Sequence, residues 1–183
     1  MNDYQLRLKQ IIKDDPDMLL AMEAVEQLNL NDAWICAGFI RNKVWDRLHH
    51  LKTSLNDIDV IYFNEINKST EKDQGLEKML GELMPGQPWS VKNQARMHVV
   101  SGFPPFQSSK EGVSHFPETA TAIAIRKVKQ EIDIMAPYGL ADLFEMKVKP
   151  TPYFQDNKRH KIYIDRIKRK QWQKKWYKLK IEY

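Results

Sequence analysis

The sequence predicts an α+β (mixed α/β) fold in which helices flank a small mixed central sheet. Apolar residues recur with helical spacing over residues 4–30. Short apolar or β-branched runs at residues 33–38 and 57–63 are typical of buried strands. A helical segment separates these two runs, and a basic segment closes the chain. This alternation of helices and strands favours a mixed sheet over an all-helical or all-β fold.

Each element follows from a local pattern. We expect two helices within residues 4–30, because Pro16 interrupts the helical spacing after Asp14 and Asp15. A helix over residues 40–50 connects the first two strands. The other expected elements are a helix over 69–83, a strand over 89–100, a loop over 101–117 with at most a short helix, hairpin strands over 119–127 and 131–135, a short helix over 140–146 and a basic helix over 161–180.

The composition is that of one globular domain. The chain has 183 residues, of which 42% are hydrophobic and 29% charged. We divide this single expected domain into N-terminal helices over residues 1–30, a core over 33–146 and a basic C-terminal extension over 147–183. Cys36 is the one cysteine, which excludes a disulfide framework and a thiolate zinc cluster. With no run near the roughly 20 apolar residues of a membrane helix and no signal peptide, we expect a cytoplasmic protein without a membrane partner.

Charge is distributed unevenly along the chain. From Lys147 onwards there are 13 Lys and Arg against 3 Asp and Glu, although the whole chain has a net charge of only +5. Such a basic segment, with Trp172 and Trp176 among its lysines, has the composition of an RNA-facing helix. Alternatively, the two tryptophans lie four residues apart and form an apolar stripe that docks the helix on the domain. The lysines would then face solvent or the rim of an active cleft.

Asp57 and Asp59 are the first candidate functional residues. Positions i and i+2 of a strand face the same way, so both carboxylates lie on one face, while Ile58 and Val60 point into the core. Two such charges repel each other unless a cation lies between them, and Mg²⁺ prefers oxygen ligands of this kind. The alternative is two solvated acids at a strand end.

Upstream of this pair, Gly38 ends one strand and begins a helix. Free N–H groups at a helix N-terminus suit a triphosphate, and glycine lets a phosphate approach the backbone closely. Arg41 and Asn42 add hydrogen-bond donors, and Phe39 is included in the candidate nucleotide site. The alternative for Gly38 is a simple turn glycine.

This arrangement resembles the nucleotidyltransferase superfamily related to DNA polymerase beta. The chain is most similar to a family of bacterial nucleotidyltransferase-like proteins, and the resemblance extends over nearly its whole length. The runs that carry it are Trp34–Asn42, Val44–Asp46, Leu55–Phe63, Val91–His98 and Ala136–Phe144. The resemblance implies the nucleotidyltransferase fold, with residues 33–146 as its catalytic core.

The resemblance also implies a reaction and its ligands. A nucleoside monophosphate would pass from an NTP to an acceptor, with two Mg²⁺ ions held by Asp57 and Asp59. Members of the superfamily usually carry a third carboxylate on a later strand. Asp133, with apolar residues on either side, is the candidate for that position, and Asn93 is a poorer one. An exposed acid on an edge strand is the alternative for Asp133.

The polar run over residues 92–98 is unusual for the central strand predicted there. Lys92, Arg96 and His98 would share one strand face with Gln94, and Asn93 would face the opposite way. We include Lys92, Asn93, Arg96 and His98 in the nucleotide site as one wall of a pocket, with His98 as a possible general base. A solvated sheet face is the alternative.

The favoured function is therefore a Mg²⁺-dependent nucleotidyltransferase whose acceptor is a small molecule, a protein or an RNA. The alternative is a catalytically degenerate nucleotide- or RNA-binding protein on the same fold. A toxin–antitoxin-like or partner-regulating module is a third hypothesis.

Overall fold

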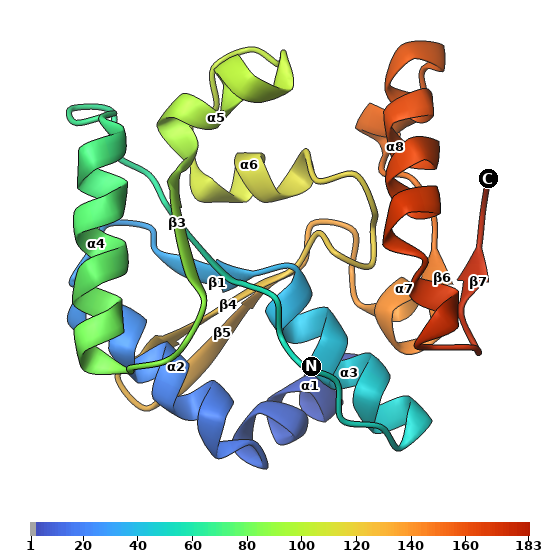
Figure 1. Cartoon of the computed structure of the whole chain (residues 1–183), viewed down its shortest axis with the longest axis horizontal. Coiled ribbons are helices and arrows are strands. Elements are labelled where there is room, and N and C mark those ends of the chain that lie inside the picture. Colours follow the sequence, from blue (N-terminus) through green and yellow to red (C-terminus); the bar gives the residue numbers. More distant parts are fainter. Residues whose placement is uncertain (1–2) are drawn as a thin grey trace.

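A five-stranded mixed sheet lies at the centre of the computed structural model, which describes residues 3–183 (Figure 1). Its strands are β1 (Trp34–Cys36), β2 (Ile58–Tyr62), β3 (Trp89–Asn93), β4 (Ala124–Val128) and β5 (Glu131–Met135). The spatial order is β3-β2-β1-β4-β5. The β2–β3 pair is parallel and the other pairs are antiparallel. The predicted fold class is confirmed.

Helices cover both faces of this sheet. They are α1 (Asp3–Lys13), α2 (Pro16–Gln27), α3 (Gly38–His49), α4 (Thr70–Leu83), α5 (Gln94–Ser101), α6 (Ser109–Ser114), α7 (Ala141–Phe144) and α8 (Asn157–Lys170). In Figure 1, α1, α2 and α3 lie below the sheet, α5 and α6 lie above it, and α8 stands to one side. A small parallel pair, β6 (Lys147–Val148) with β7 (Lys180–Ile181), lies beside α8.

Strand β2 divides the core between the two faces of the sheet. Ile58, Val60 and Tyr62 are buried in the cluster formed with α1 to α4, whereas Ile61 packs in the smaller cluster on the opposite face. Asp59 shares the face of Ile61 because side chains alternate along a strand. The prediction that Ile58 and Val60 point into the core is confirmed.

The N-terminal helices break where the sequence predicts. Pro16 begins α2, and the side chain of Asp15 accepts a hydrogen bond from the backbone N–H of Met18 as the N-cap. Lys43 of α3 pairs with the same aspartate over 2.6 Å, which ties the turn to the body of the protein. Residues 1 and 2 of the segment predicted over 1–30 lie outside the described residues.

The strand predicted over residues 89–100 is wrong in its second half. Strand β3 ends at Asn93, whose side chain caps α5 by accepting from the N–H of Ala95. Asparagine is a strong N-cap, and this local hydrogen bond replaces the next step of the sheet ladder. Helix α5 then ends at Gly102 in the left-handed conformation, with a φ of 68°. Lys92, Gln94, Arg96 and His98 therefore do not share one strand face.

The basic helix predicted over residues 161–180 begins and ends earlier. Asp156 caps α8 by accepting from the N–H of Arg159, and the helix stops at Gln171, whose φ is 48°. The two tryptophans follow in a turn, where Trp172 and Trp176 pack against Trp45 with ring centroids 5.6 and 5.2 Å apart. Both are buried, so the docking interpretation of the pair is confirmed, although they follow α8 and Trp172 begins a short 3-10 helix.

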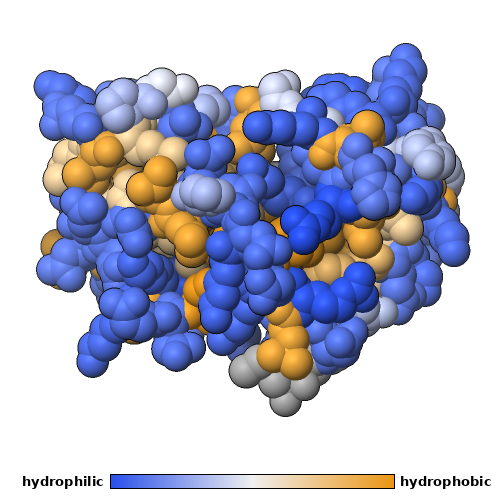
Figure 2. All heavy atoms as spheres, turned by 90° about the horizontal axis from the view of Figure 1, so that it is seen from below, coloured by the Kyte–Doolittle hydropathy of each residue, from blue (hydrophilic) through white to orange (hydrophobic). Residues whose placement is uncertain are grey.

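Hydrophilic side chains dominate the face seen in Figure 2, where apolar side chains form separate small patches. Within residues 3–183, no helix is long and apolar enough to cross a membrane.

Candidate active site

Asp57 and Asp59 form the centre of the site, at the start of β2. Asp57 is exposed and Asp59 is half-buried. Burial and the neighbouring charge of Asp57 raise the pKa of the Asp59 carboxyl, while a hydrogen bond with Ser90 and the charge of Lys92 oppose this rise. Two carboxylates in mutual repulsion can share a cation, as the sequence pattern predicts.

Helix α3 begins next to this pair. A Cβ atom added to Gly38 would lie 3.9 Å from Oδ1 of Asp57 and 3.5 Å from Nη2 of Arg41. The first turn of the helix, with its free N–H groups, therefore lies beside the aspartates, and a glycine keeps the space open.

Arg41 is the buried cation of the site. Its Nη2 donates to Oδ1 of Asn42 over 2.7 Å, its Nε has no partner among the described residues, and its guanidinium lies 4.3 Å from the ring centroid of Trp172. Burial lowers the pKa of Arg41 to about 10, with a smaller contribution from the nearby charge of Arg166. The structure thus brings Gly38, Arg41 and Asn42 to the aspartate pair. Phe39 is a core residue with 1% exposure and does not reach the site.

Helix α8 adds two cations, Arg166 and Lys170, of which Lys170 is one of the C-terminal lysines that the sequence places at the solvent side or the rim of an active cleft. Arg166 donates from Nε to Oε1 of the fully buried Glu118 over 2.6 Å. Burial and the charges of Arg166 and Arg41 lower the pKa of Lys170, whereas Asp57 raises it. Lys170 therefore lies within electrostatic reach of Arg41, Arg166 and Asp57. The sequence signal that links the two is their spacing, because residues four apart share a helix face.

Asp133 does not join the pair. It lies on the edge strand β5 and accepts hydrogen bonds from Nε and Nη2 of Arg126 over 3.1 and 3.0 Å. Strands β1 and β4 separate β5 from β2, and three strand spacings of about 4.8 Å put Asp133 out of reach of a shared ion. Among the described residues, no group of three His, Cys, Asp or Glu side chains is placed to hold a metal. The geometry therefore gives Asp133 no role as a third ligand.

Of the four polar residues predicted over 92–98, only Lys92 reaches the site. It lines a cavity together with Asp59. Asn93 is fully buried, and its amide bonds the backbone of Asn64, Asn67 and Ala95.

Arg96 and His98 lie on α5, away from the aspartates. Arg96 forms an ion pair with the buried Asp73, which also accepts a hydrogen bond from the Tyr62 hydroxyl. The ring of His98 packs against Phe106, and its Nδ1 is buried without a partner among the described residues. These contacts stabilise α5 rather than form a pocket wall beside Asp59.

The donor set at Asp57 and Asp59 fits Mg²⁺. Two carboxylates are enough, because Mg²⁺ is commonly held by one or two of them together with substrate phosphates and water. The repulsion that raises the pKa of Asp59 would be relieved by a cation between the two groups.

Comparison with known proteins agrees with the fold. A solved structure described as a CCA-adding enzyme head domain matches with a TM-score of 0.84 and 34% identity, over 96% of this chain and 94% of the other. Longer chains share only the fold. A CCA-adding enzyme in complex with ATP matches at 16% identity and a TM-score of 0.57, and the Bacillus stearothermophilus CCA-adding enzyme in complex with CTP at 15% and 0.51. This chain spans 42% and 39% of their lengths. No curated protein matches the sequence.

The fold is thus that of a nucleotidyltransferase. The model of a nucleotidyltransferase family matches residues 23–181, and the chain belongs to that family. The resemblance noted in the sequence is confirmed.

Proposed function

We propose that this protein is a Mg²⁺-dependent nucleotidyltransferase that transfers a nucleoside monophosphate from an NTP to an acceptor. The observation that carries the proposal is the position of Gly38 at the start of α3. A Cβ atom added to Gly38 would lie 3.9 Å from Oδ1 of Asp57. A helix N-terminus that binds phosphate thus adjoins a carboxylate pair that suits a metal.

Three cations lie within electrostatic reach of the aspartate pair, and their positive charge complements that of a triphosphate. Arg41 comes from α3, and Arg166 and Lys170 come from α8. The guanidinium of Arg41 is held by Asn42 and Trp172, so it is oriented before a ligand arrives. Phosphoryl-type transfer depends mainly on such positioning and charge neutralisation.

In the proposed reaction, the acceptor group forms a bond to the α-phosphorus and gives up its proton to water. The bond between the α-phosphorus and the oxygen that bridges to the β-phosphate breaks, so that pyrophosphate leaves. Bound Mg²⁺ would supply charge neutralisation at the attacking and leaving oxygens. Asp57 and Asp59 would hold it, and the three cations would orient the departing phosphates. The CCA-adding enzymes of similar fold, solved with ATP and CTP, support an NTP as the donor.

A calorimetric titration tests this proposal. We expect ATP and the other NTPs to bind in Mg²⁺ and to lose affinity by at least about tenfold in EDTA or in the double variant Asp57→Asn/Asp59→Asn. The matched control is Asp17→Asn, which removes an exposed aspartate of α2 and should leave affinity unchanged. Equal NTP binding by the wild type and the double variant would contradict the proposed site.

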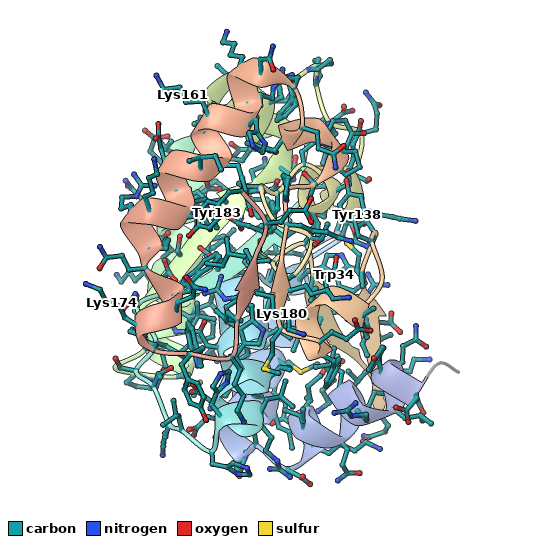
Figure 3. All side chains as sticks on the ribbon, turned by 90° about the vertical axis from the view of Figure 1, so that its right-hand side faces the viewer. Trp34, Tyr138, Lys161, Lys174, Lys180 and Tyr183 are labelled. Carbon is teal, nitrogen blue, oxygen red and sulfur yellow. The ribbon has the colours of Figure 1, made fainter. Side chains whose placement is uncertain are left out.

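A nucleic-acid-binding protein without catalysis is the second candidate. It is favoured by exposed basic side chains on and after α8, and Figure 3 shows Lys161 and Lys174 on the outer edge of this segment. A solved structure of similar fold is described as a tRNA-processing enzyme, which makes RNA the first ligand to try.

The double variant also separates the two candidates. The nucleic-acid-binding candidate would be favoured by two results together. The double variant would still bind RNA with a steep salt dependence, and neither the wild type nor the variant would release pyrophosphate from NTP.

A further inference from the structure

A cavity of about 250 Å³ opens beside Asp59, between the sheet and helices α5 and α6. It is too small for a macromolecule and lies below the roughly 300–1,000 Å³ of pockets that enclose whole drug-sized ligands. Most of its lining side chains are apolar or aromatic, including Met97, Phe106 and Phe116. Its size and lining suit one planar ring of a ligand whose remaining groups lie outside the cavity.

The cavity and the three cations are formed by different elements around the aspartate pair. Arg41, Arg166 and Lys170 come from α3 and α8, whereas the cavity is lined by β2, β3, α5 and α6 (Figure 1). In the proposed function, on which this inference rests, the phosphates lie among the cations. With its phosphates there, an NTP can place its uncharged nucleoside end in the cavity, because Asp59 lines it.

One polar side chain that lines the cavity has an acceptor atom without a hydrogen-bond partner. Gln94, only 4% exposed, donates from Nε2 to the backbone oxygen of Lys92 over 3.4 Å. Its Oε1 accepts no hydrogen bond within residues 3–183, and it is not one of the fully buried unpaired atoms of those residues, so it is accessible from the cavity. Because the amide nitrogen is used by a carbonyl, the free atom is the carbonyl oxygen, which can only accept. An accessible acceptor without a protein partner is available to an N–H group of a ligand in the cavity.

Helix α6 fixes the position of this amide. A Cβ on Gly112 would lie only 2.2 Å from Oε1 of Gln94, so the side chain fills the space that any other residue would need. Next to it, His115 packs against Phe106 with ring centroids 4.8 Å apart, and its Nδ1 is held by the backbone oxygen of Glu111. Aromatic rings of this kind form a surface on which a base can stack.

We propose that the cavity beside Asp59 is the nucleobase subsite of the NTP, and that Oε1 of Gln94 accepts a hydrogen bond from an exocyclic amine of the base. Three ligands separate the parts of this proposal. ATP has the amine, ITP has an oxygen in its place, and inorganic tripolyphosphate has no base. Gln94→Met removes the acceptor at similar size, Gly112→Ala displaces it, and Gln74→Met at an exposed position of α4 is the matched control.

We expect the wild type and Gln74→Met to bind ATP at least about tenfold more tightly than ITP in Mg²⁺. ITP would place the oxygen of its base, an acceptor, next to Oε1 of Gln94, which is also an acceptor. In Gln94→Met and Gly112→Ala this ratio should fall to within about twofold, with tripolyphosphate affinity unchanged. Thermal unfolding of both variants checks that they fold.

Equal binding of ATP and ITP by the wild type, or an unchanged ratio in both cavity variants, would overturn the subsite while leaving the proposed function intact. Failure of both ATP and tripolyphosphate to bind would overturn the proposed function and the subsite with it.

Discussion

Arg166 and Glu118 form an ion pair of 2.6 Å that joins α8 to the turn before β4. Glu118 is fully buried, and its other oxygen accepts from the Thr121 hydroxyl over 2.7 Å. The pair is also close to Arg41, whose pKa the Glu118 charge raises against the effect of burial. Glu118 therefore holds the basic helix against the sheet and balances the cations beside the aspartates.

Glu118→Gln should lower the free energy of unfolding by about 2–4 kcal/mol. Removing one partner of a buried ion pair leaves the other charge poorly compensated, and Gln keeps the size of the side chain. Urea unfolding measures the loss. Glu71→Gln, at an exposed position of α4, is the control and should change stability by less than about 0.5 kcal/mol. Equal stability of the Glu118 variant and the wild type would contradict the structural role of the pair.

Lys170→Gln should weaken NTP binding by about three- to tenfold at low salt and by less at high salt, because a partly exposed charge near the triphosphate is screened. Lys161→Gln removes the same charge from the same helix, where the side chain points away from the protein (Figure 3). We expect no change in NTP affinity for this variant. Calorimetry at two salt concentrations measures the NTP affinity of both variants. An equal loss of affinity in both would show that net charge, and not the position of Lys170, determines the effect.

The sequence predicted the aspartate pair and the start of α3 because their patterns are local. The alternation around Asp57 and the glycine between a strand and a helix need no information about distant residues. Two errors came from competing local signals. The strand that begins at Trp89 was extended to residue 100 because the residues after Asn93 alternate weakly, but the side chain of Asn93 ends the strand by capping α5. The pattern around Asp133 predicts a strand, but it does not indicate which strands lie next to that strand in the sheet.

Glu118 and Arg166 could not be found in this way, since they reach the site only through tertiary packing, whereas Lys170 is one of the C-terminal lysines expected at the solvent side or the rim of the cleft. Glu118 and Arg166 are 48 residues apart. Each is an ordinary charged residue in its local context. Gln94 was placed on a strand with Lys92, and its contact with Gly112 depends on the helices α5 and α6 that the sequence analysis did not resolve.

Asp133→Asn should leave NTP-dependent pyrophosphate release within about twofold of the wild type, since Asp133 pairs with Arg126 at the sheet edge. Both side chains are partly exposed, so the loss of stability should also be below about 1 kcal/mol. Asp59→Asn serves as the contrasting variant and should abolish release. A loss of turnover in Asp133→Asn without a loss of stability would restore Asp133 as a ligand.

Trp176→Phe should destabilise the C-terminal segment by about 1–3 kcal/mol. The indole Nε1 donates to Oδ1 of Asp46 over 2.8 Å in a buried position, and phenylalanine leaves that carboxylate oxygen without its partner. Hydrogen exchange of β7, which pairs with β6, should become faster. Trp89→Phe, at a half-buried ring with a longer hydrogen bond of 3.4 Å, is the comparison and should have a smaller effect.

Tyr62→Phe tests the link between the sheet and α4 through pH. The Tyr62 hydroxyl donates to Oδ1 of the buried Asp73 over 2.8 Å, and burial, followed by this hydrogen bond, raises the pKa of the phenol above its ordinary value near 10. In the unfolded chain the phenol loses its proton near pH 10, whereas the folded protein retains it. The unfolded state then binds fewer protons, so the stability of the wild type falls as pH rises through 10.

The variant lacks this ionisation. It should be less stable than the wild type by about 1 kcal/mol at pH 8, and this difference should shrink between pH 9.5 and 11. Urea unfolding over this range measures it. Tyr177→Phe, at a side chain with 72% exposure, is the control and should show no pH-dependent difference. A gap between Tyr62→Phe and the wild type that stays constant or widens at high pH would contradict a folded-state phenol held protonated by its contact with Asp73.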